Sequence, residues 1–254
     1  MKRYEQNRIY ISTEAQARIR EFRVLIVGMG MGSSIAETML RMGFERITLV
    51  DTAIVEAQLL SYENFTMIDV GIPKVEALRT RLLSINPDAT IVVHAEKLCE
   101  EGISMLVHKN DVIINCLPLS DEFTLVWDSI ATEQGLYVLH PCNIGFAVAV
   151  MVIKPGGTSL TNVCSVREMR SLGDLTAVKY ITDYFNYWVR PKLWIEQAMA
   201  KCRKEKAPRI LPQMSLAATY AAGICTSVVY RIVQGEYVKS FPKFYYYSEC
   251  DDLD

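Results

Sequence analysis

The feature that most constrains the fold is a glycine turn between an apolar strand and a helix. The stretch "RVLIVGMGMGSSIAETMLRMGF" starts with residues that suit a buried strand, and Gly28, Gly30 and Gly32 follow at once. Ser33 stands where a third glycine would complete the pattern G-x-G-x-x-G. Glycines let the backbone turn tightly and approach a phosphate, which the N-terminus of the next helix stabilises. The stretch therefore predicts a strand, turn and helix of the kind that binds nucleotides.

An acidic residue extends this pattern. Asp51 ends a second apolar stretch, "ERITLVD", and lies 21 residues after Gly30. This is close to the spacing at which an acid binds a ribose hydroxyl in dinucleotide-binding folds. Two interpretations remain open at this point. The turn binds a nucleotide or dinucleotide, or it is kept only for packing.

Strand-like and helix-like stretches alternate along the next hundred residues. We expect a helix over residues 73–85, and strands in "ATIVVHAE", "DVIINCLPL" and "GLYVLHPCNIG". Further helices are expected over about residues 98–108 and 122–134. This alternation, with apolar strands, predicts an α/β fold with a Rossmann-like, doubly wound, mostly parallel sheet.

The chain divides into four predicted parts. A helical pattern in "EAQARIREF", with Ser12 or Thr13 as its cap, marks an N-terminal arm and helix. An apolar helix that stops at Gly235, a closing strand and an acidic tail follow a charged, aromatic segment. The predicted boundaries are 1–22 for the arm and helix, 23–158 for the nucleotide-binding core, 159–210 for a variable helical and loop segment, and 211–254 for the C-terminal part.

Composition limits the possible partners. The net charge of −2 argues against a global basic field for nucleic acid or anionic lipid. Seven cysteines without a C-x-x-C pair argue against a paired-knuckle zinc site and favour reduced thiols. The start lacks the apolar core of a signal peptide, and no apolar run reaches the ~20 residues that span a bilayer. We therefore expect a cytoplasmic protein with no metal ligands of its own, no nucleic acid and no membrane.

Several motifs together resemble the ThiF/MoeB-type adenylyltransferases, the bacterial relatives of the ubiquitin-activating enzymes. They are "GMGMGSSIAETMLRMGFERITLVD", "DVGIPKVEALRTRLLSINPDA", "NDVIINCLPL", "VLHPCNIGF" and "LPQMSLAATYAAGICTSVVYRIVQGE". The resemblance covers about residues 3–155 and 210–245. It implies a ThiF-like fold, dimerisation with a second copy or a related subunit, and ATP with magnesium as cofactors. It also implies adenylation of a carboxylate, usually at the C-terminus of a ubiquitin-like or sulfur-carrier protein, with a small molecule as the other possible acceptor.

The resemblance also implies site residues. Lys74, after "DVGIP", keeps the lysine that reaches the phosphates in the family. Arg8 and Arg3 are candidates for the N-terminal arginine that reaches into the partner's nucleotide site, although Gln6 is another residue for that position. The implied nucleotide-binding residues are Gly28, Gly30, Gly32, Ser33, Asp51, Lys74 and Asn115.

Other family positions have changed. After the second strand the family reads D-x-D-x-V-x-x-S-N-L-N-R-Q, and here Ala53 replaces the second acid and Leu59 the asparagine. Tyr62 replaces the arginine, Glu63 the glutamine, and Pro118 the aspartate that holds magnesium. Losing one preorganised charge stabiliser costs about 3–4 kcal/mol in a transition state. A neutral tyrosine hydroxyl does not replace a charged guanidinium. The sequence thus predicts a degenerate adenylation centre.

Three functions remain open. The first is a scaffold, regulatory or partner subunit that binds a nucleotide at most weakly and offers an arginine to a catalytic partner. The second is a working adenylyltransferase that uses a rearranged set, Lys74, Arg8, Asp51 and Glu63. The third is a dinucleotide oxidoreductase, which has no support in the sequence after Asp51.

Cysteines and histidines add weaker candidates. Cys142 and Cys164 could form a thioester, but neither has the adjacent basic residues that lower a thiol pKa. His94 and His108 suit ordinary strand and helix-end positions. His140 and Asn143 lie at the carboxyl edge of the expected sheet, where ligands bind in such folds.

Overall fold

The computed structural model describes residues 2–119, 121–160, 175–188, 190, 192–204 and 212–251. Within these residues the sheet has seven strands in the order β3-β2-β1-β4-β5-β6-β7. The strands are β1 (Arg23–Val27), β2 (Arg46–Val50), β3 (Thr90–His94), β4 (Val112–Asn115), β5 (Tyr137–Asn143), β6 (Ala147–Ile153) and β7 (Phe244–Ser248).

The first five strands are parallel, and β6 is antiparallel to both of its neighbours. The chain runs outward from β1 through β2 to β3 and then returns, so that β4 pairs with the free side of β1. The carboxyl ends of β1 and β4 therefore meet at a topological switch point, where ligands bind in open α/β sheets. The predicted Rossmann-like, mostly parallel sheet is confirmed.

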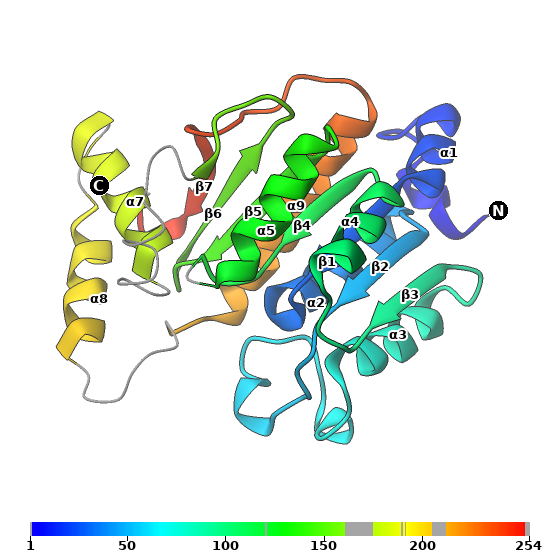
Figure 1. The fold of residues 1–254 in the computed structure, drawn as a ribbon, viewed down its shortest axis with the longest axis horizontal. Coiled ribbons are helices and arrows are strands. Elements are labelled where there is room, and N and C mark those ends of the chain that lie inside the picture. The colour runs from blue at the N-terminus through cyan, green and yellow to red at the C-terminus, as the bar shows by residue number, and fades with distance from the viewer. Residues whose placement is uncertain are drawn as a thin grey trace.

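Helices cover both faces of this sheet (Figure 1). The buried side chains of α1, α2, α3 and α9 join one core with β1 and β2, while those of α4, α5, α7 and α8 join a second core on the other face. The bounds are α1 (Thr13–Glu21), α2 (Met29–Met42), α3 (Lys74–Ile85), α4 (Glu100–His108), α5 (Glu122–Glu133), α7 (Leu175–Trp188), α8 (Leu193–Lys204) and α9 (Ser215–Val233), with 3-10 turns η1 (Lys2–Asn7), η2 (Ala57–Leu59), η3 (Met67–Asp69) and η5 (Glu249–Asp251).

Local sequence explains several boundaries. Ser12 caps α1, because its hydroxyl accepts a hydrogen bond from the amide of Ala15 at 3.1 Å. Helix α2 ends at Gly43, whose φ of 118° is left-handed, and α9 ends shortly before Gly235. The Ser12 cap of α1 and the end of α9 near Gly235 match the expectations from the sequence.

Helix α9 is long and apolar enough, by length and composition, to cross a membrane. Its buried face, which includes Ala217, Ala221, Cys225 and Val229, packs into the core that α2 and the sheet also form. In Figure 1 α9 lies behind the sheet, on the side opposite α5. A core helix of an α/β domain has this composition because it is covered on most sides.

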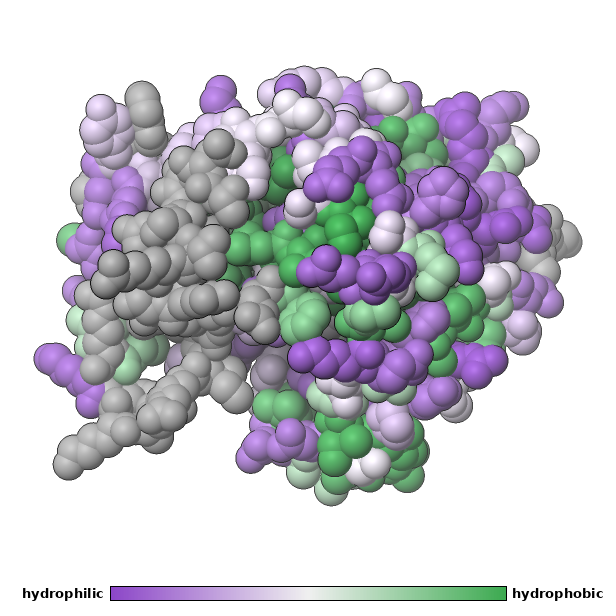
Figure 2. Space-filling view, viewed as in Figure 1, coloured by the Kyte–Doolittle hydropathy of each residue, from purple (hydrophilic) through white to green (hydrophobic). Residues whose placement is uncertain are grey.

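The segment between β2 and α3, residues 51–73, is here called the motif loop. Its backbone is held by hydrogen bonds between Val55 and two residues near its end, Gly71 and Ile72, at 2.9 Å each. Several of its large apolar side chains are exposed, and Figure 2 shows hydrophobic residues at the lower end of the molecule, where this loop lies in Figure 1. They are Ile54, Met67, Ile68, Val70 and Ile72.

Candidate functional site

The glycine turn lies at the carboxyl end of β1, as predicted. Gly28 has a φ of 85°, and a Cβ there would lie 3.1 Å from the carbonyl carbon of Cys116. Position 28 thus requires glycine for two reasons, its backbone conformation and the close approach of the chain after β4. Helix α2 begins at the next residue, so its positive N-terminal end faces the switch point.

Asp51 uses both of its carboxylate oxygens within the chain. Oδ2 accepts a hydrogen bond from the amide of Met29 at 2.6 Å, and Oδ1 accepts one from the amide of Ala53 at 2.8 Å. The first bond places a negative charge at the N-terminus of α2, which stabilises the helix. The acid predicted for a ribose hydroxyl therefore also has a structural role.

A cavity of about 300 Å³ opens beside the glycine turn, and we call it the central cavity. Four of the predicted site residues line it, namely Gly28, Gly30, Asp51 and Lys74. The other lining residues are Met31, Tyr62, Glu63, Cys116, Leu117, Pro118, Leu119, His140, Pro141, Cys142, Asn143, Val178 and Gln213.

A second cavity, of about 340 Å³, lies beside the first, and Asp51 and Leu117 line both. We call it the flanking cavity. Phe123 and Trp127 of α5 contribute aromatic rings, and the ammonium of Lys97 lies 4.4 Å from the centre of the Phe123 ring. The acid after β2 therefore borders both cavities.

Lys74 is the first residue of α3 and is buried, with 7% of its side chain exposed. Its Nζ lies 2.6 Å from Oε1 of Glu63, whose side chain is 1% exposed. Burial raises the pKa of the Glu63 carboxyl, while the Lys74 ammonium opposes that rise. The lysine that would contact phosphates is therefore already paired with a carboxylate.

Three of the five positions predicted from the sequence to have changed, Tyr62, Glu63 and Pro118, line the central cavity. The resemblance implies an arginine at position 62 and a magnesium-binding aspartate at position 118, and this assignment stays a prediction. Within the described part of the chain, no group of three or more His, Cys, Asp or Glu side chains is arranged to hold a metal ion. The set of residues present does not fit a triphosphate with its magnesium, because the lining has two carboxylates, Asp51 and Glu63, and its one ammonium, Lys74, is already paired with Glu63.

Three other predicted residues lie away from the cavity lining. The amide of Asn115 donates to the carbonyl of Thr124 at 3.2 Å, and its Oδ1 accepts from the amide of Leu117. Ser33 is fully buried and links the turn to the motif loop through the carbonyl of Gly30 and the amide of Asn64. A Cβ on Gly32 would lie 3.0 Å from the side chain of Ile26. Each of these three residues has a packing or bonding role of its own.

Arg8 is exposed on the N-terminal arm, where its guanidinium donates to the carbonyl of Glu5 at 3.1 Å. Arg3 binds Asn86 and Asp88, just before β3, and Asn7 binds the carbonyl of Met42. These contacts hold the arm at the amino-terminal edge of the parallel strands, opposite the central cavity. The role of Arg8 at a partner's site stays a prediction.

His140 forms a buried pair that the sequence did not reveal. Its Nε2 lies 2.9 Å from Oδ2 of Asp128 in α5, and both side chains are less than 10% exposed. Nδ1 of His140 is buried and has no hydrogen-bond partner. The sequence signal was Asp128 itself, an acid between the apolar residues Trp127 and Ile130 of an expected helix.

Asn143 and Cys142 follow His140 on β5. Asn143 joins β5 to the start of α9, because its amide donates to the carbonyl of Met214 at 2.9 Å. Burial raises the pKa of the Cys142 thiol to about 12, so this residue lacks the thiolate character of a nucleophilic cysteine. Cys164 lies outside the described residues.

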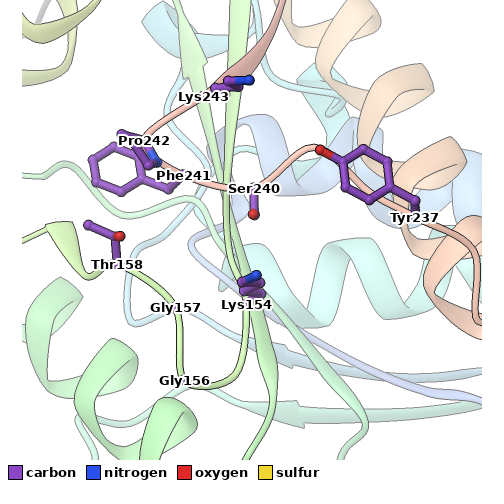
Figure 3. Close-up of a pocket in the computed structure, with 9 residues that line it drawn as sticks. All are labelled: Lys154, Gly156, Gly157, Thr158, Tyr237, Ser240, Phe241, Pro242 and Lys243. Atoms are coloured by element: carbon purple, nitrogen blue, oxygen red, sulfur yellow. The ribbon is translucent and has the colours of Figure 1, made fainter.

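A third cavity, of about 660 Å³, lies between the turn after β6 and the loop before β7 (Figure 3). We call it the distal cavity. Lys154 and Lys243 line it on opposite sides of Ser240, and neither forms an ion pair with a described residue. The lysines and most of their neighbours are exposed, and the glycine turn and Asp51 do not line this cavity. Its size thus does not make it the nucleotide site.

Comparison with known proteins identifies a family. The sequence matches the ThiF family over residues 4–251. The sulfur carrier protein ThiS adenylyltransferase of Bacillus subtilis is 26% identical over 162 residues, 61% of this chain and 48% of that protein. The molybdopterin-synthase adenylyltransferase of Salmonella typhimurium is 30% identical over 105 residues, 41% of this chain and 42% of that protein. The chain spans less than half the length of these two relatives.

Solved structures share the fold. The tRNA N6-threonylcarbamoyladenosine dehydratase of Escherichia coli, in complex with AMP, aligns with a TM-score of 0.67 at 13% identity, covering 92% of this chain and 95% of that one. E. coli MccB with ATP aligns with a TM-score of 0.64 at 15% identity, covering 97% of this chain and 71% of that one. At such identities the likeness concerns the fold alone.

Proposed function

Because the chain belongs to the ThiF family, we propose that it is an adenylyltransferase-fold protein whose own adenylation centre is degenerate. It acts as a scaffold, regulatory or partner subunit of an activating enzyme, and it binds a nucleotide at most weakly. The observation that carries this proposal is that Tyr62 and Pro118 line the central cavity, and the sequence resemblance predicts an arginine and an aspartate at these two positions. The chain thus has the family fold without the predicted arginine and aspartate charges at these two positions.

Electrostatics supports the proposal. Adenylation is attack of a carboxylate oxygen on the α-phosphate of ATP with loss of pyrophosphate, and negative charge grows in its transition state. Such a site needs arginine, lysine or magnesium. The charged side chains of the central cavity are two carboxylates, Asp51 and Glu63, and one ammonium, Lys74. The net charge of these three side chains is negative, and it opposes binding of a triphosphate.

The direct test is pyrophosphate exchange into ATP by the purified chain, with magnesium and candidate carboxylates. Candidates include the C-terminal peptide of a sulfur-carrier protein and free amino acids. We expect no exchange above the background of a heat-denatured sample, and calorimetry with ATP and magnesium should give weak binding or none. Exchange that depends on magnesium and on one carboxylate would overturn the proposal.

A working adenylyltransferase is the second candidate. It is favoured by the fact that the glycine turn, Asp51 and Lys74 do line one cavity together. Its reaction would have to proceed without the family's arginine. In the exchange assay this candidate predicts loss of activity in Lys74→Met. The match to the ThiF family gives no support to a dinucleotide oxidoreductase, and NADH fluorescence quenching would be its test.

The proposed partner is either a second copy of this chain or a related ThiF-like subunit. The related subunit would have the arginine and aspartates that this chain lacks. Arg8 supports this arrangement, because it is exposed on an arm that lies away from its own central cavity. The motif loop and the arm also expose large apolar side chains, such as Ile68 and Tyr10, each 87% exposed. The six described cysteines are free thiols, which fits a cytoplasmic protein.

Size-exclusion chromatography with light scattering measures the oligomer, and co-purification identifies a related subunit. If the partner idea holds, Arg8→Ala in this chain will lower the activity of the catalytic partner without preventing assembly. Unchanged partner activity would contradict the role of Arg8 while leaving the degenerate centre in place.

A further inference from the structure

The space above the glycine turn is filled by the chain's own side chains. A Cβ on Gly30 would lie 3.5 Å from Oε1 of Glu63 and 3.7 Å from Cε2 of Tyr62. Glycine in such a turn ordinarily lets a phosphate approach the N-terminus of the helix. Here a carboxylate and an aromatic ring cover the second glycine of the turn.

The carboxylate of Glu63 has the electrostatic partners that a phosphate would have. It lies 2.6 Å from the ammonium of Lys74, and it faces the first turn of α2, whose amides favour an anion. With 1% of the side chain exposed, this carboxylate is not solvated by bulk water. Its partners within the protein are therefore what keeps a negative charge at this position acceptable.

Glu63 is also held firmly in place. Its amide donates to the carbonyl of Leu59 at 3.0 Å, and the next amide, that of Asn64, donates to the hydroxyl of Ser33 at 3.0 Å. Ser33 in turn donates to the carbonyl of Gly30 at 2.7 Å. The motif loop is thus fastened to the same turn that its carboxylate covers.

We propose that Glu63 is a resident substitute for a phosphate, and that it makes the central cavity selective against nucleoside triphosphates. The inference rests on the proposed function, which it deepens by naming the residue that excludes the ligand. A triphosphate would have to compete with a tethered anion for Lys74 and for the end of α2, and its own charge would repel Asp51 and Glu63. Glu63 is therefore a specificity-determining residue rather than a catalytic one.

The test compares ATP binding to the wild-type chain and to Glu63→Gln by isothermal calorimetry at fixed magnesium and salt. Glutamine has the same shape but no charge, and it leaves Lys74 free to bind a phosphate. We expect ATP to bind this variant at least about tenfold more tightly, since a buried like-charge contact costs more than one decade of affinity. Equal affinity for variant and wild type overturns the inference.

Two matched variants separate the local effect from a general change in charge. Glu56→Gln removes a carboxylate from an exposed position of the same loop, and its ATP affinity should stay at the wild-type value. Glu63→Gln combined with Lys74→Met removes the freed ammonium, and the gain should disappear. A gain in Glu56→Gln as large as that in Glu63→Gln would also overturn the inference.

A second variant at position 63 guards against the case in which Glu63→Gln does not fold. Glu63→Met replaces the carboxylate by a side chain that needs no hydrogen bond. ATP binding is then measured on whichever of the two variants folds. If neither folds alone, refolding in the presence of inorganic pyrophosphate decides, because an anion that binds Lys74 stabilises the native state. Recovery supports the inference, and no recovery overturns it.

Failure of the inference about Glu63 can be distinguished from failure of the proposed function. Pyrophosphate exchange by the wild-type chain would contradict the degenerate adenylation centre, whatever the ratio of ATP affinities between Glu63→Gln and the wild type. A gain of ATP affinity in Glu63→Gln without exchange would support both. Tight ATP binding by the wild type without exchange would overturn the role of Glu63 and the weak nucleotide binding, and it would leave the catalytically degenerate centre in place.

Discussion

The central cavity and the distal cavity both contain lysine, but only one of them balances the charge inside the protein. Lys74 is buried and has Glu63 at 2.6 Å, whereas Lys154 and Lys243 are exposed and form no ion pair with a described residue. Water and salt solvate the exposed pair, but a buried ammonium needs a carboxylate or a ligand. Burial and charge pairing at Lys74, rather than cavity volume, therefore distinguish the candidate nucleotide site from the distal cavity.

The largest effect is expected from breaking the buried ion pair between Lys74 and Glu63. Lys74→Met leaves Glu63 as an uncompensated buried carboxylate, which should lower the free energy of unfolding by about 3–5 kcal/mol. Urea denaturation measures it. The control is Lys154→Met, which should change stability by less than about 0.5 kcal/mol. Similar losses in both variants would show that the two cavities do not differ as described.

The pH dependence of that loss sharpens the comparison. Burial raises the pKa of Glu63, so its protonated form favours the native state, and that stability is lost as the pH rises through the folded-state pKa. In Lys74→Met no ammonium opposes the rise. We therefore expect the stability deficit to grow from pH 4.5 towards neutral pH, as measured by urea denaturation at each pH. A deficit independent of pH would mean that Glu63 does not change its protonation there.

A smaller effect concerns the acid after β2. Asp51→Ala removes the acceptor for the amide of Met29 and should cost about 1–2 kcal/mol, the usual value of a helix cap. Asp51→Asn keeps an acceptor oxygen and should cost less. Thr52→Ala, at the exposed next position, is the control. No loss in Asp51→Ala would contradict the capping role.

The smallest effect is a salt dependence. At low ionic strength the exposed lysines of the distal cavity should give the wild type weak ATP binding that disappears near physiological salt. The double variant Lys154→Ala, Lys243→Ala should reduce this residual binding by a factor of about three, in line with two exposed charges. If Lys74→Met reduced it more, the residual binding would belong to the central cavity.

The fold could be predicted because its elements are local. Apolar strands of four to seven residues, glycine at helix ends and a serine cap are each visible within one stretch of sequence, and all were found in the structure. The changed positions Tyr62 and Pro118 could also be named, because their distance along the chain from Asp51 and from Asn115 matched a known pattern.

The contacts of the site could not be predicted in this way. Glu63 meets Lys74 only because the motif loop folds back on α2, and His140 meets Asp128 only because α5 packs on β5. The amide of Asn115 donates to the carbonyl of Thr124 in α5, and no neighbour along the chain indicates this partner. Its role at a nucleotide stays a prediction. The direction of a side chain at a strand end depends on tertiary packing.

The bonding of Asp51 has a consequence for reading other sequences of this kind. Since its carboxylate holds the start of α2, a mutation that removes it harms folding even in a protein that never meets a nucleotide. Natural selection on stability alone would then retain the glycine turn and its acid. Their presence in a chain reports a well-made junction between β1 and α2, and the residues that face the ligand have to be inspected separately.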